Sequence, residues 1–159
     1  MTFTLTSTGF ADGGTLPDAQ IYAKGNRSPQ LSWAGAPEGT KSFAITCYDP
    51  DAPTGSGFWH WTVANIPVDV TKLAEGASSA GLPKGAIEGR TDFGEPGFGG
   101  AAPPPGHGPH HYVFTVFAVG GESLPVTSED SGAKYGFNLH FNTLAKASIT
   151  GIYENAGQA

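Results

Sequence analysis

Apolar and polar residues alternate with a period of two, or form short continuous apolar runs, along most of this chain. Both patterns are typical of β-strands. They predict strands over residues 2–7, 30–34, 42–49, 59–66, 86–91 and 111–119. The runs at 42–49 and 111–119 are the longest, so we expect them to be central strands covered on both faces. Residues 70–76 permit a short helix or turn.

One segment departs from this strand pattern. Between Ser128 and Leu144, Phe137, Phe141 and Leu144 recur at the three- and four-residue spacing of one helix face. Glu129 and Asp130 would lie at the positive end of the helix dipole. A short strand, ITGIYE, is expected to follow. The pattern predicts a mainly β protein, a single domain over residues 1–159, with one or two helices including one near the C-terminus.

Composition supports a turn-rich β protein. The 159 residues include 24 glycines and 13 prolines, and only 14% are charged. The net charge of −6 provides no basic stripe for nucleic acid and disfavours anionic membrane surfaces. No apolar run is long enough to span a bilayer, and the N-terminus does not resemble a signal peptide. Cys47, the single cysteine, lies in an apolar run and is expected to be a buried, inert thiol. These features predict a cytoplasmic location.

Residues 94–109, GEPGFGGAAPPPGHGP, look like low complexity. A linker is the simplest interpretation, but the segment lies between two predicted strands and no second domain needs a tether. A long loop inside one domain is more often a binding loop or lid.

Several polar residues flank the predicted strands. In an extended segment, Trp59 and Trp61 would point to one face as core residues and His60 to the other. His60 is then either a pocket residue or a buried histidine bonded to backbone. By the same alternation, His110 and Tyr112 share a face below the loop, whereas His107 and His111 face the solvent or the loop. Ordinary packing is the alternative for Tyr112.

The stretch YDPDAP ends a predicted strand in two carboxylates. Pro50 and Pro53 cannot donate ladder hydrogen bonds, so Asp49 and Asp51 should lie at the mouth of the strand. Asp49 is the better pocket residue, because Asp51 is expected to accept backbone N–H groups in a turn. No metal site is predicted, because His110 and His111 would face opposite ways and no Cys pair or HExxH motif is present. No cofactor is predicted, and a cysteine or serine nucleophile has no support either.

Two of these segments, YDPDAPTGSGFWHW and GAAPPPGHGPHHY, together strongly resemble the phosphatidylethanolamine-binding protein family, also called Raf kinase inhibitor proteins. The likeness is greatest to the bacterial and archaeal YbhB/YbcL branch, and it extends to SPQLSW, RTDFG and GFNLHFNTLAKASITG. The resemblance implies an antiparallel β-sandwich with Greek-key connections and a small anion pocket at one end.

Carried over by position, the resemblance implies a pocket lined by a set of residues from both segments. These are Asp49, His60, the loop positions Gly100, Ala102 and Pro104, and then His110 and Tyr112, with Asp51, Pro53 and Trp59 nearby. His111 replaces the arginine usual between this histidine and tyrosine, so an ion pair made by that arginine is lost or becomes pH-dependent. The basic C-terminal helix of the animal proteins has no counterpart, which weakens the transfer of their kinase partners.

We expect Asp49 to orient and charge an imidazole, His60 being the first choice, and the imidazoles, the Tyr112 hydroxyl and loop N–H groups to bind the anion. Three functions follow from this. The first is a regulatory module that binds a small anion, such as a phosphate or phosphorylated head-group, and inhibits or modulates a kinase or another enzyme. The second is an enzyme using Asp, His and Tyr as general acids and bases. The third is an interaction protein with a vestigial pocket. A homodimer is also expected.

Overall fold

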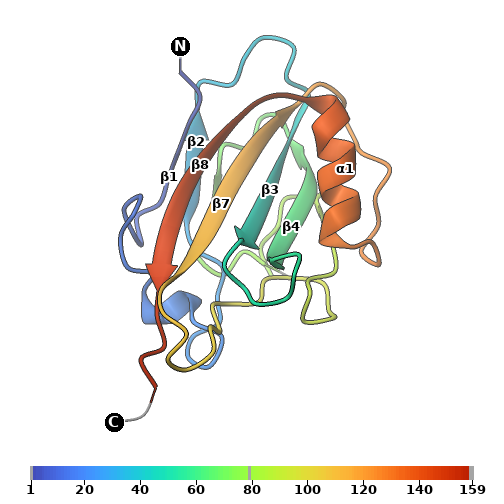
Figure 1. The fold of residues 1–159 in the computed structure, drawn as a ribbon. Helices are drawn as coiled ribbons and strands as arrows, with labels where there is room; N and C mark the ends of the chain where they lie inside the picture. Colours follow the sequence, from blue (N-terminus) through green and yellow to red (C-terminus); the bar gives the residue numbers. More distant parts are fainter. Residues whose placement is uncertain (1, 79, 158–159) are drawn as a thin grey trace.

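The computed structural model describes residues 2–78 and 80–157, which form two antiparallel sheets (Figure 1). The smaller sheet has the order β1 (Thr4–Thr6), β2 (Leu31–Ala34) and β5 (Lys72–Leu73). The larger has the order β6 (Ile87–Glu88), β4 (Phe58–Pro67), β3 (Ser42–Asp49), β7 (His110–Val119) and β8 (Thr143–Tyr153). The predicted mainly β fold is therefore confirmed.

The main hydrophobic core takes side chains from both sheets. It includes Leu5, Leu31 and Trp33 from the smaller sheet and Ile45, Trp61 and Phe114 from the larger one. Fully burying a large apolar side chain contributes roughly 1.5–3 kcal/mol to folding, so this shared core holds the sheets together. The predicted central strands are confirmed as β3 and β7, each with a neighbour on both sides. Cys47 is buried among these residues, and burial raises the pKa of its thiol, with the charge of Asp49 adding to the effect.

The larger sheet contains the expected Greek-key connection. Strands β3, β4 and β6 lie side by side in chain order, and the chain then returns to place β7 against the free side of β3. The long glycine- and proline-rich segment 94–109 is part of this return. It is long because it must cross the end of the sheet.

Some predicted elements differ from those observed. Residues 72–73 form strand β5 of the smaller sheet, where a short helix or turn was expected. A 3-10 turn at Asp18–Gln20 had no clear sequence signal. β8 begins directly after the helix, at Thr143, and pairs with β7 over its whole length, so it is longer than the ITGIYE strand.

The predicted C-terminal helix is present as α1 (Gly132–Asn142), beside β4 (Figure 1). Ser131 caps it, because its hydroxyl accepts a hydrogen bond from the Lys134 backbone N–H at 3.2 Å. The predicted apolar face is wrong, since Phe137 and Phe141 are 66% and 70% exposed. Tyr135 and Leu139 are the buried side chains.

The alternation expected at the two tryptophans is also wrong. A β-bulge places one step of β3, from Cys47 to Tyr48, opposite two steps of β4, from Trp61 to Trp59, which leaves His60 as the extra residue. Trp59 therefore contacts α1, where it closely approaches Gly132, while Trp61 packs in the main core. The bulge turns His60 towards the same end of the core as Tyr112.

No helix among the described residues is long and apolar enough to cross a membrane.

Candidate functional site

A cavity of about 240 Å³ lies where the β3–β4 connection, the 94–109 loop and the start of β7 meet. Its lining includes Asp49, His60, Ala102, Pro104, His110 and Tyr112, all of which the sequence placed near a common pocket. Pro53, expected nearby, also lines it. The four polar side chains among them, Asp49, His60, His110 and Tyr112, are between 1 and 3% exposed. Ligand binding by these residues stays a prediction.

Strand geometry explains how the polar side chains meet. Asp49 is the last residue of β3 and His110 is the first residue of β7, the next strand in the sheet. Tyr112 follows His110 by two positions and so shares its face. His60 reaches the cavity because of the bulge in β4.

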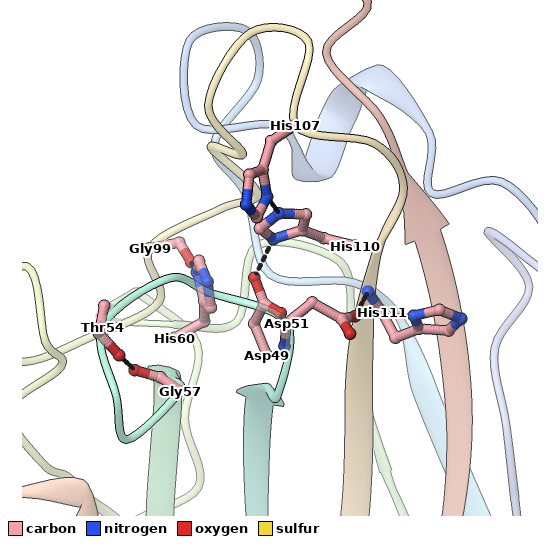
Figure 2. A network of polar contacts seen from close by, with 9 residues as sticks. All are labelled: Asp49, Asp51, Thr54, Gly57, His60, Gly99, His107, His110 and His111. Carbon is pink, nitrogen blue, oxygen red and sulfur yellow. Dashed lines mark hydrogen bonds and ion pairs between the residues drawn. The ribbon is translucent and has the colours of Figure 1, made fainter.

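Asp49 and His110 form a buried ion pair in which the His110 Nδ1 atom lies 2.6 Å from the Asp49 Oδ2 atom (Figure 2). The other carboxylate oxygen of Asp49 accepts the Asp51 backbone N–H at 2.7 Å. The expectation that Asp49 orients His60 is therefore wrong. Asp49 orients His110, because β3 and β7 are adjacent and the two residues lie at the neighbouring ends of these strands.

His60 instead contacts backbone. Its Nδ1 atom lies 2.8 Å from the Gly99 carbonyl oxygen, so Nδ1 carries the proton and donates it (Figure 2). Burial lowers the pKa of His60, and the nearby carbonyls and the charge of Asp49 offset that effect only in part. The expectation of a charged His60 in the free protein is thus also wrong. The neutral ring presents Nε2 as a hydrogen-bond acceptor.

The Tyr112 hydroxyl has no hydrogen-bond partner among the described residues, although its oxygen is buried. Burial raises the pKa of this phenol far above its usual value, and the charge of Asp49 raises it further. The Ala102 backbone acts in the opposite direction on that pKa, although its geometry is not that of a hydrogen bond. Tyr112 is therefore neutral, and its O–H donates to no described residue.

His107 contacts the second nitrogen of His110. Its Nδ1 atom lies 2.7 Å from the His110 Nε2 atom, and the two rings meet edge to face (Figure 2). His107 is exposed, as expected, but its ring also contacts His110, which was not expected. Sequence reasoning missed the contact, because it depends on how the loop folds back onto β7.

Outside the cavity, His111 pairs with Asp51 at 2.7 Å between Nδ1 and Oδ2, and its backbone N–H donates to the same oxygen. Burial by itself would raise the pKa of Asp51, but these hydrogen bonds hold it below its usual value. Asp51 therefore accepts a backbone N–H as expected, but from a distant strand and not from its own turn.

The remaining cavity walls are mostly apolar. Phe58, Phe93, Ala52 and Thr54 line it and were not predicted, whereas Pro103 lies in the predicted loop around Gly100 to Pro104. Phe58 belongs to the quoted motif YDPDAPTGSGFWHW and Phe93 to RTDFG, so membership of these motifs was an available signal.

Besides Asp51, two predicted positions lie outside the cavity lining. The Gly100 backbone N–H donates to the Asn26 side chain at 2.8 Å, and Gly100 packs against the backbone of residues 20–22. Gly100 is not part of the lining, and neither is Trp59. Among the described residues no group of three or more metal-ligating side chains is close enough to hold an ion.

The chain is similar to known proteins along almost its full length. The family model described as phosphatidylethanolamine-binding protein matches residues 6–154. The UPF0098 protein YbcL of Escherichia coli (strain K12) is 52% identical over 96% of this chain and 87% of its own. The UPF0098 protein YbhB of the same organism is 49% identical over 94% of this chain and 98% of its own.

Solved structures agree with this match. The crystal structure of E. coli YbcL, described as a member of the mammalian PEBP family, superimposes with a TM-score of 0.95 at 51% identity, covering 97% of this chain and 99% of that one. A PEBP homologue from Chlamydia trachomatis gives a TM-score of 0.83 at 27% identity, covering 96% and 97%. Because the fold, the family model and these relatives agree, the chain belongs to the phosphatidylethanolamine-binding protein family.

Proposed function

We propose that the protein binds a small anionic group, a phosphate or a phosphorylated head-group, in the cavity beneath the 94–109 loop, and that it acts as a ligand-binding regulatory module. One observation carries this proposal. The Tyr112 side chain lines the cavity, and its buried hydroxyl has no hydrogen-bond partner among the described residues. Leaving a buried hydroxyl unpaired costs about 1–3 kcal/mol, so such a group is retained where a ligand can accept its hydrogen bond.

The charges around the cavity define how the anion would be held. The carboxylate of Asp49 would balance the charge of a protonated His110, and burial lowers the pKa of His60 and so favours its neutral form. The site therefore has no standing excess of positive charge. An entering anion would favour the charged form of His60, so binding should take up a proton and strengthen as the pH falls.

The apolar walls restrict what the anion is attached to. Phe58, Phe93, Ala52 and Pro53 leave room beside the polar groups for a compact apolar portion of the ligand. The family name points to a lipid head-group, and a free phosphomonoester offers the same chemistry.

Weak binding is expected for the bare anion. Each hydrogen bond to a charged group contributes about 1.5–3 kcal/mol. Two or three of them, set against the cost of association, correspond to an affinity on the order of millimolar to micromolar.

Calorimetric titration tests the proposal. Phosphate, phosphoethanolamine and acetate are titrated into the wild type, into His60→Asn, and into His140→Asn as a control on α1 away from the cavity. His60→Asn keeps a donor for the Gly99 carbonyl but cannot ionise. We expect phosphate binding that strengthens from pH 8 to pH 6 in the wild type and the control, with this pH dependence reduced in His60→Asn. Absence of heat with every ligand over this range would reject the anion site and favour the interaction protein with a vestigial pocket.

The enzyme alternative also has a specific observation in its favour. The His60 and Tyr112 rings lie 5.1 Å apart, centroid to centroid, with a neutral imidazole acceptor next to a neutral phenol donor. This is a suitable arrangement for general acid–base chemistry. A bell-shaped pH–rate profile on a candidate substrate, abolished by Tyr112→Phe, would support catalysis over binding alone.

Three further expectations stay predictions. The inhibition or modulation of a kinase or another enzyme and a homodimeric state come from the family resemblance, and a cytoplasmic location comes from the sequence features. Co-purification of a partner that is lost in the double variant Asp49→Ala with His60→Ala would connect the first of these to the cavity.

A further inference from the structure

The two nitrogens of His110 have different partners. Nδ1 faces the Asp49 carboxylate at 2.6 Å, and Nε2 faces His107 Nδ1 at 2.7 Å. His110 is almost fully buried, whereas His107 is exposed. The three side chains thus form a continuous line from the cavity to the solvent (Figure 2).

The number of protons on the facing nitrogens of His107 and His110 is limited by their close contact. The facing nitrogens of His107 and His110 must hold one proton between them, because two protons would repel and none would leave two lone pairs opposed. When His110 is neutral, His107 donates to it. When His110 is charged, it donates to His107. The same contact therefore suits both charge states of His110.

The loop holds His107 in place for this contact. The His107 backbone N–H donates to the Pro104 carbonyl at 3.1 Å, and the Gly106 N–H donates to the Asn155 carbonyl at 2.8 Å. Pro104 also lines the cavity, so the segment that forms its wall carries the partner of His110.

We propose that His107 is a positioning residue of the anion site: it fixes the His110 ring against Asp49 and accepts the Nε2 proton when His110 is charged. The inference rests on the proposed function for its effect on the ligand, but the His107–His110 contact is independent of it. His107 does not line the cavity, so it acts through His110.

Other titratable groups surround the pair and must be considered in any pH experiment. They are Asp49 and Asp51 from the end of β3, His60 from β4, His111 and Tyr112 from β7, Tyr153 opposite His110 on β8, and Glu154 beyond it. None of them changes the count of one proton between the facing nitrogens.

The first test uses the ligand-free protein labelled with ¹⁵N, and it reads the imidazole protons by long-range NMR correlation. We expect the His107 Nδ1 and His110 Nε2 atoms to carry one proton between them at pH 8, with His140 as a reference ring on α1. Signals of His107 that match those of His140, or facing nitrogens that are both bare, would overturn the assignment.

The second test measures phosphate affinity from pH 6 to pH 8 in His107→Ala, His107→Asn and the control His140→Ala. Loss of one hydrogen bond to a charged group predicts about a tenfold weaker affinity in His107→Ala. The variation of affinity with pH should also change in His107→Ala, because a charged His110 would have lost the acceptor of its Nε2 proton. A displaced loop would weaken binding equally at every pH.

His107→Asn should restore both properties, because its amide can donate or, after a flip, accept near the position of Nδ1. Wild-type affinity and pH dependence in His107→Ala would overturn the proposal. A wild type that binds no phosphate would contradict the proposed function, and the NMR test would then decide the His107 assignment by itself.

Discussion

The Nδ1 atom of His110 lies 2.6 Å from the Oδ2 atom of Asp49, across 61 positions of sequence. Both side chains are buried, and each comes from the end of a central strand. The pair therefore links two segments that border the cavity, the β3–β4 connection and the loop before β7.

Breaking this pair should destabilise the fold strongly. Asp49→Ala leaves the buried His110 without its counter-charge, and loss of one partner of a buried pair costs about 3–5 kcal/mol. The matched control is Asp51→Ala, which breaks the exposed pair with His111 and should cost about 1 kcal/mol or less. Urea unfolding at pH 7.5 measures both. Equal losses in the two variants would show that the buried Asp49–His110 pair contributes no more to the free energy of unfolding than the exposed Asp51–His111 pair.

Tyr112→Phe should separate stability from binding. The substitution removes a buried hydroxyl that has no partner in the described part of the chain, so the free energy of unfolding should not fall and should rise by about 1 kcal/mol. Phosphate affinity should fall by about tenfold, because the anion loses a donor. A clear loss of stability would mean that the hydroxyl has a structural partner, and unchanged affinity would place the anion elsewhere.

The stability of the free protein should fall in acid because of His60. Its pKa is lowered by burial from the usual 6.5, so the unfolded chain binds a proton more readily than the folded one. The contribution is complete above pH 6.5 and is lost as the pH falls through the lower folded value. Urea unfolding at pH 7.5 and 5.5 should show a larger loss in the wild type than in His60→Asn. Parallel losses in the two proteins would contradict a neutral, buried His60.

Gly57→Ala should disturb the turn that forms one side of the cavity. Gly57 has a φ of 71°, and an added Cβ would collide with the Tyr48 hydroxyl. Gly55 in the same turn has a φ of 83° but open space around it, so Gly55→Ala carries the backbone strain alone, about 1–2 kcal/mol. Thermal unfolding should show a larger loss for Gly57→Ala. Equal losses would mean that the Tyr48 ring and the Asp49 carbonyl both adjust to the added Cβ without cost.

Much of the fold follows from local patterns. The apolar runs that became β3 and β7 are long and β-branched or aromatic, so their type and central position could be predicted from period and composition. Helix α1 could also be predicted, but its buried face could not. Gly132 lets the Trp59 ring approach the helix closely. Tyr135 and Leu139 are buried in a second core cluster with side chains of the larger sheet, in place of Phe137 and Phe141.

The candidate site also has features that local patterns predict and features that depend on strand pairing. Alternation placed His110 and Tyr112 on one face of a strand, and the quoted motifs added Asp49 and His60 to the same end of the sheet. Alternation could not reveal the bulge in β4, which depends on how β4 pairs with β3.

Local patterns and motifs were sufficient to predict the strand content, the C-terminal helix, the family and the residue types gathered around the cavity, since these depend on neighbours along the chain. The pairing of Asp49 with His110, the hydrogen bond from His60 to the Gly99 carbonyl and the contact of His107 with the far side of His110 depend on the folded arrangement. These contacts join segments up to 61 positions apart, and which atoms meet depends on strand order, register and loop path across the sheet.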